Sequence, residues 1–161
     1  RAAELFHAMG SRILAFSRHR KENVPDYVTY VTLEELLGQS DIVSLHCPLT
    51  PETRGLINAE RIALMKKTAV LINAARGPVA DSRALADALN EDRIAGAGVD
   101  VFEMEPPVPA DHPLLHAKNC LVTPHVAFAS EESMKLRADI VFDSLQEWLK
   151  GGQVNTVLPR A

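Results

Sequence analysis

Short apolar runs alternate with segments of helical periodicity along most of this chain of 161 residues. Each run has four or five residues, the length of a buried strand and far below the roughly 18 that a membrane span needs. Strand, helix and strand in succession pack as right-handed β-α-β units. The sequence therefore predicts an α/β protein with a doubly wound parallel sheet. The expected strands cover residues 12–16, 41–45, 69–72, 97–101 and 120–123, and the expected helices cover residues 1–9, 33–37, 58–65, 82–89 and 130–150.

Polar residues mark the starts of two of these helices. Asp81 stands directly before the helix at 82–89 and is expected to be its N-cap. Ser130, followed by two glutamates, is a capping signal for the longest periodic segment, which Gly151 ends. Apolar residues cover a broad face of this last helix, so we expect it to need a packing partner.

Charge and cysteine content exclude several classes of partner. The chain has 17 Lys and Arg against 21 Asp and Glu, a net charge of -4, and the basic residues form no long stripe. We therefore expect neither nucleic acid nor a membrane as a partner. Cys47 and Cys120 form no Cys-x-x-Cys pair, which favours reduced thiols in a cytoplasmic protein over a disulfide or a zinc site. No metal site is expected.

Three chemically active side chains follow three successive expected strands: Arg76, Glu105 and His125. Because ligands bind at the carboxyl ends of parallel strands, we expect these residues to converge on one edge of the sheet. A cation, an acid and an imidazole there can hold a carboxylate and pass a proton to its neighbouring oxygen. Each also has a purely structural interpretation: Arg76 and Glu105 as solvated surface charges, His125 as a loop histidine, and the nearby Asp100 as a strand-end cap.

Four ordered motifs resemble one family across essentially the whole chain. They are "LHCPLTPETRGLI" (45–57), "LINAARGPVAD" (71–81), "GAGVDVFEMEPP" (96–107) and "TPHVAFAS" (123–130). Together they are similar to the D-isomer-specific 2-hydroxyacid dehydrogenases, which include phosphoglycerate, glycerate and hydroxypyruvate enzymes. The resemblance implies a Rossmann-like fold and hydride transfer between a nicotinamide cofactor and C2 of a small 2-hydroxy or 2-keto acid.

The resemblance also implies residue roles. The catalytic arginine, glutamate and histidine of the family correspond to Arg76, Glu105 and His125, and the residue that holds the nicotinamide carboxamide corresponds to Asp100. Further cofactor-binding positions implied by the match are His46, Cys47, Pro48, Thr53 and Ala74.

The choice of cofactor depends on the residues after the first expected strand. Members that prefer NAD place an acid there to bond the ribose 2'-hydroxyl, whereas this chain has Ser17 followed by Arg18, His19 and Arg20. Serine and arginine would accept the 2'-phosphate that an acid repels, which favours NADP. A solvated basic loop, with the dinucleotide held by other contacts, is the alternative, so the expected cofactor is NADP or NAD.

The resemblance implies two parts. Residues 1–128 would be a partial dinucleotide-binding domain whose glycine-rich turn lies upstream of Arg1. Residues 129–161, a long helix and tail, would return to a substrate domain not present in this chain. We therefore expect a full-length homodimer, and a fragment that alone binds dinucleotide poorly and is inactive. A dinucleotide-sensing corepressor on the same scaffold, or an inactive truncated product, are the competing interpretations.

Overall fold

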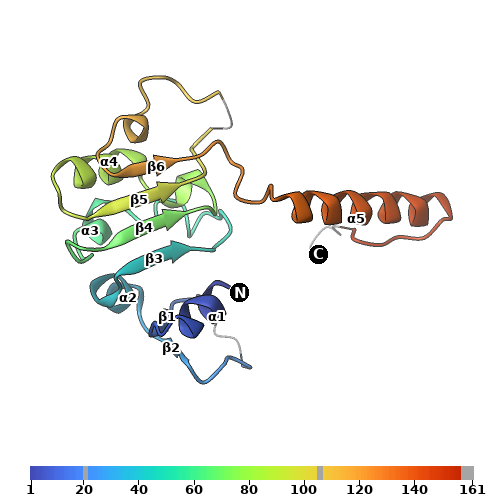
Figure 1. The fold of residues 1–161 in the computed structure, drawn as a ribbon, viewed down its shortest axis with the longest axis horizontal. Helices are drawn as coiled ribbons and strands as arrows, with labels where there is room; N and C mark the ends of the chain where they lie inside the picture. The colour runs from blue at the N-terminus through green and yellow to red at the C-terminus, as the bar shows by residue number, and fades with distance from the viewer. Residues whose placement is uncertain (20–21, 105–106, 157–161) are drawn as a thin grey trace. The chain divides into compact units, whose positions relative to one another are not determined.

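The computed structural model describes residues 1–19, 22–104 and 107–156 (Figure 1). It divides into two compact units, Arg1–His125 and Val126–Ala161. Among the residues described, no helix is both long enough and apolar enough to cross a membrane.

A four-stranded parallel sheet is the centre of the first unit (Figure 1). Its strands lie in the order β3 (Ile42–Leu45), β4 (Val70–Asn73), β5 (Gly96–Val99) and β6 (Cys120–Val122). The register pairs Leu45 with Asn73, Asn73 with Val99, and Val99 with Val122, so all four strands end level at one edge. This confirms the predicted parallel α/β fold.

Two further strands, β1 (Ile13–Ala15) and β2 (Val28–Tyr30), pair in parallel as a separate sheet. The described strands thus form two sheets, where the sequence suggested one. β2 was not predicted, because its sequence Val-Thr-Tyr is not the unbroken apolar run by which the other strands were recognised. A cavity of about 950 Å³ is lined by residues of both β1 and β3.

The helices of the first unit begin at side-chain caps in three of four cases. They are α1 (Ala2–Ala8), α2 (Leu33–Gln39), α3 (Ala59–Ile62) and α4 (Ser82–Asn90), with short 3-10 turns η1 (Gly77–Val79) and η2 (Pro113–Leu115). Thr32 and Glu35 form a reciprocal capping box at α2. Asn58 caps α3. The Oδ1 of Asp81 accepts from the backbone N–H of Ala84 at 3.0 Å, which confirms the predicted cap.

The core of the first unit forms where the sheet packs against these helices. Its fully buried apolar side chains come from α2, α3, β4, η1, α4, η2 and the segment before α3: Leu37, Ile57, Ile62, Leu71, Val79, Leu85, Leu89 and Leu114. Burying such side chains contributes about 1.5–3 kcal/mol each. This packing holds the strand ends in place.

The second unit consists mainly of α5 (Glu131–Leu149), whose N-cap is Ser130 as predicted. No residue of α5 is buried. Its large apolar side chains, including Leu136, Phe142 and Trp148, are exposed.

Trp148 offers a direct test because it is the only tryptophan of the chain and 64% exposed. We expect acrylamide to quench its fluorescence nearly as efficiently as it quenches free N-acetyl-tryptophanamide, since solvent reaches most of the ring. A quencher-resistant signal from this chain would contradict the exposed face.

Gly77 marks a close approach between two loops at the carboxyl edge of the sheet. A Cβ atom built on Gly77 would lie 1.9 Å from the backbone carbon and oxygen of Phe102 and 2.6 Å from the backbone nitrogen of Glu103. The obstacles are backbone atoms, which cannot rotate away as a flexible side chain could. Only glycine therefore allows the loop after β4 to pack on the segment after β5.

We expect Gly77→Ala to lower the free energy of unfolding by about 3 kcal/mol, since the added methyl group must displace backbone. Gly38→Ala is the matched control: Gly38 lies within α2, and a Cβ there meets nothing closer than 3.7 Å. This control should gain about 0.5–1 kcal/mol from helix propensity. Urea unfolding of the two variants compares them, and equal midpoints would contradict the close approach.

Candidate functional site

Asn73 shapes the turn that carries Arg76. It is the last residue of β4 and only 2% exposed. Its Nδ2 donates to the backbone oxygen of Arg76 at 3.1 Å, and its Oδ1 accepts from the backbone N–H of Ala75 at 3.2 Å. A buried amide satisfied on both sides fixes this turn. The sequence analysis missed Asn73, although a polar residue at the end of an apolar run was a signal for it.

Arg76 itself is exposed. Its Nη1 donates to the backbone oxygen of Ala75 at 2.6 Å. Within the described ranges it takes part in no ion pair with a carboxylate. Its guanidinium can therefore accept an external anion in a bidentate arrangement.

Arg76 and His125 line one pocket of about 260 Å³ at the carboxyl edge of the sheet. Arg54, Glu103 and Met104 are also among its lining residues. His125 has a φ of 58°, in the left-handed region that non-glycine residues rarely adopt. Strained backbone of this kind clusters at functional sites. Glu105, the third residue of the predicted catalytic set, lies outside the described residues.

Asp100 ties the ends of three strands together. It is buried, its backbone N–H donates to the oxygen of Asn73 at 2.9 Å, and its Oδ1 accepts from the Oγ1 of Thr123 at 2.6 Å. These bonds match the strand-end interpretation of Asp100. Asp100 and Ala74 do not line either of the two cavities described here.

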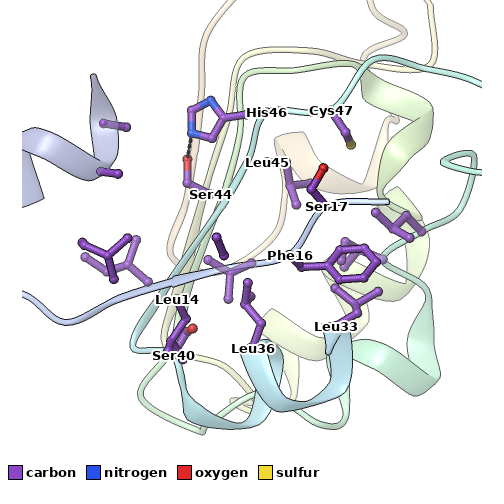
Figure 2. A pocket seen from close by; sticks show the side chains of 18 of the residues that line it. Leu14, Phe16, Ser17, Leu33, Leu36, Ser40, Ser44, Leu45, His46 and Cys47 are labelled. Carbon is purple, nitrogen blue, oxygen red and sulfur yellow. Dashed lines mark hydrogen bonds between the residues drawn. The ribbon is translucent and has the colours of Figure 1, made fainter. Parts of the chain in front are cut away.

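The larger cavity, of about 950 Å³, brings together six of the predicted cofactor-binding residues. Apolar side chains of β1, α2 and β3, such as Leu14, Leu36 and Leu45, form part of its wall (Figure 2). Polar residues line the cavity in the loops after β1 and β3 and also near the starts of these strands, where Arg12, Asp41 and Lys66 contribute. The predicted residues among those that line the cavity are Ser17, Arg18, His46, Cys47, Pro48 and Thr53. Arg20, which was also predicted, lies outside the described residues.

Hydrogen bonds order the loop after β3. The Nε2 of His46 lies 2.9 Å from the Oγ of Ser44 (Figure 2). Thr53 donates through Oγ1 to the backbone oxygen of Pro48 at 2.7 Å. Burial raises the pKa of the Cys47 thiol, so it stays protonated at neutral pH and presents no charge to a ligand.

The larger cavity contains an acid that the sequence analysis missed. The Oε2 of Glu52 lies 3.3 Å from the Nη1 of Arg18, and both side chains are largely exposed. Glu52 also accepts from the Oγ1 of Thr50 at 2.6 Å, and chiefly this bond lowers its pKa. An ionised carboxylate therefore stands beside Arg18, in the same cavity as Ser17.

Among the described residues, the cysteines and the possible metal ligands form neither a disulfide nor a metal-binding cluster. Cys47 and Cys120 are both free thiols. In residues 1–19, 22–104 and 107–156, no three His, Cys, Asp or Glu side chains are placed to hold a metal ion.

Comparison with known proteins gives close and extensive similarity. The chain is 44% identical over 155 residues to hydroxypyruvate reductase from Blautia hydrogenotrophica, covering 96% of this chain and 48% of that protein. The chain spans about half the length of the curated relatives it matches.

Solved structures agree with the fold. The NAD-complexed D-isomer specific 2-hydroxyacid dehydrogenase from Lactobacillus delbrueckii matches with a TM-score of 0.86 and 34% identity, over 98% of this chain and 52% of that one. A D-isomer specific 2-hydroxyacid dehydrogenase from Xanthobacter autotrophicus, in complex with NADPH and MES, matches with a TM-score of 0.79 and 37% identity, over 98% and 65%.

The family model for the NAD binding domain of D-isomer specific 2-hydroxyacid dehydrogenases matches residues 1–127. That range includes both cavities and the parallel sheet whose carboxyl edge carries Arg76 and His125. The chain therefore belongs to the D-isomer specific 2-hydroxyacid dehydrogenase family and carries its NAD-binding domain.

Proposed function

We propose that this chain is the cofactor-binding part of an oxidoreductase that moves a hydride between a nicotinamide cofactor and C2 of a small 2-hydroxy or 2-keto acid. The observation that carries the proposal is that Arg76 and His125 line the same pocket. A 2-keto acid presents a carboxylate beside a carbonyl, and these two side chains match those two groups.

Each residue of the proposed catalytic set has one task. Arg76 holds the substrate carboxylate or carbonyl and stabilises negative charge that develops on the oxygen. His125 donates a proton to that oxygen in reduction and removes it in oxidation. Glu105 orients the imidazole of His125 and fixes its tautomer. The cofactor supplies the hydride, while the protein supplies position and charge.

The carboxyl-terminal end of the larger cavity, formed by the loops after β1 and β3, is the proposed place of the cofactor. The rest of this cavity runs along β1 and β3 and is lined mainly by apolar side chains. Ser17, Arg18, His46 and Thr53 bring hydroxyl, imidazole and cationic groups to the carboxyl-terminal end, which suit a ribose and its phosphate. Asp100, which lines neither cavity, follows β5 at the same edge of the sheet and holds the nicotinamide carboxamide in this proposal. A glycine-rich turn upstream of Arg1 completes the site by binding the pyrophosphate.

Glu52 and Ser17 set the preference between NAD and NADP in opposite directions. Ser17 brings no negative charge against a 2'-phosphate. Arg18 is a cation that such a phosphate would bind, but Glu52 already pairs with it at 3.3 Å. The 2'-phosphate of NADP must therefore compete with the Glu52 carboxylate for Arg18. NAD has no 2'-phosphate, so its binding does not require that contact.

The same proposal includes the oligomeric state and the cellular location of the full-length protein. Residues 129–161 return to a substrate domain, and the full-length protein is a homodimer that acts in the cytoplasm, where the free thiols of Cys47 and Cys120 stay reduced. Relatives named as reductases and dehydrogenases support an enzyme over a corepressor. Turnover of glyoxylate or hydroxypyruvate with NADH or NADPH decides between them.

Replacing Arg76 tests the catalytic assignment in the full-length enzyme. We expect Arg76→Ala to lower kcat/KM for 2-keto acid reduction by about 30- to 1000-fold, because a charge-assisted contact that strengthens in the transition state is lost. Arg76→Lys keeps the charge but not the planar fork, so it should restore only part of the rate. The melting temperature should barely change. Kinetics equal to those of the wild type would refute the proposed set.

Two substitutions test the cofactor preference. Ser17→Asp should shift the NADP/NAD ratio of kcat/KM toward NAD by about tenfold or more, since a carboxylate repels the 2'-phosphate. Glu52→Gln should shift the same ratio toward NADP by about threefold, as expected for an exposed ion pair. Glu34→Gln is the matched control, because Glu34 also faces an arginine, Arg61 at 3.9 Å, but does not line the cavity. Identical ratios in all variants would contradict the proposed position of the ribose.

A further inference from the structure

His112 is a buried histidine for which the proposed reaction has no use. It is only 8% exposed, although it lies in the long segment between β5 and β6. Its Nδ1 accepts from the backbone N–H of Leu114 at 3.4 Å, as the cap of η2. Its Nε2 lies 3.0 Å from the Oε2 of Glu103. The tautomer with its proton on Nε2 satisfies both contacts, so His112 donates to the Glu103 carboxylate.

Glu103 connects this buried histidine to the candidate active site. It lines the pocket that Arg76 and His125 also line. Burial acts to raise the pKa of Glu103, but hydrogen bonds from Ser82 and His112 outweigh it, and the pKa is lowered overall. Glu103 therefore remains ionised at neutral pH, and the contact with His112 holds it in place.

Phe102 reinforces the same connection. The His112 ring meets the Phe102 ring edge to face, with 5.1 Å between centroids. The backbone of Phe102 and Glu103 presses directly on Gly77, so that no Cβ fits between them. Gly77 is the residue next to Arg76. A shift of Phe102 and Glu103 would therefore be transmitted to the turn that presents the guanidinium.

We propose that His112 and Glu103 are a positioning pair, whose hydrogen bond holds the Phe102–Glu103 segment against Gly77 and thereby sets the position of Arg76 in the pocket. His112 lines neither cavity, so it acts through Glu103. The expected effect on catalysis rests on the function proposed above. The expected effect on the position of the Phe102–Glu103 segment is independent of that function.

Three variants of the full-length enzyme separate positioning from general stability. His112→Asn keeps an acceptor near Nδ1 for the Leu114 N–H, but its amide is too short to reach Glu103. His112→Gln extends an amide N–H toward Glu103 and restores the donor. His116→Asn is the matched control, because His116 is an exposed histidine of the same segment whose ring nitrogen Nε2 lies 2.6 Å from the backbone oxygen of Ala110 and does not contact Glu103.

We expect His112→Asn to lower kcat for 2-keto acid reduction by about 10- to 100-fold, the effect of a small misplacement of a catalytic group. The nucleotide Kd, measured by fluorescence titration, should change by less than about twofold, because the larger cavity is untouched. His112→Gln should recover most of the rate, and His116→Asn should retain it. A lower melting temperature for His112→Asn with unchanged kcat would overturn the proposal, since a merely structural histidine would behave so.

Hydrogen exchange distinguishes a failure of this inference from a failure of the proposed function. If the wild-type enzyme reduces no 2-keto acid, the proposed function is wrong. The pair is then judged by amide exchange in the segments 75–77 and 102–104. Faster exchange there in His112→Asn than in His116→Asn supports the positioning pair, and equal exchange overturns it.

Discussion

The parallel hydrogen-bond ladder from β3 to β6 is the constraint on which the site depends. Because each strand pairs in register with the next, the ends of β3, β4, β5 and β6 lie level at one edge of the sheet. Side chains that follow these strands along the sequence then become neighbours in space. Arg76 and His125 are separated by two strands in the chain, yet they line one pocket. An antiparallel arrangement would have reversed β5 and sent the residues that follow it, such as Glu103, to the opposite edge.

Beyond the ladder, small and buried polar residues fix the loops at this edge. The side-chain amide of Asn73 donates a hydrogen bond to the backbone of the turn at Arg76. Gly77 lets the backbone after β5 pack closely on that turn. Glu103 is held in place by His112. A rigid surround of this kind keeps a cationic side chain where its charge acts on a substrate, and an exposed arginine on a mobile loop would lose that advantage. The family membership of the chain gives these local contacts their functional meaning.

Prediction from the sequence succeeded where the signals are local. The strands β1 and β3–β6 lie within or one residue from the expected ranges, since short apolar runs between turn residues are typical of buried parallel strands. The caps at Asp81 and Ser130 were also predicted, because a cap depends only on the residue and its next helical turn. β2 was missed because Thr29 and Tyr30 interrupt the apolar run that marks the other strands. Glu105 and Arg20, both outside the described residues, remain predictions.

The sequence by itself determined the fold class, the order of the elements and the placement of Arg76 and His125 after their strands. Periodicity and strand ends are properties of neighbouring residues, which backbone geometry translates directly into structure. Only the tertiary structure decided that Glu52 pairs with Arg18, that Phe102 packs on Gly77 and that His112 bonds to Glu103. These contacts join different loops, and nothing in either local pattern encodes the other partner. They form because the packed sheet brings those loops together. These contacts fix which side chains surround the candidate site.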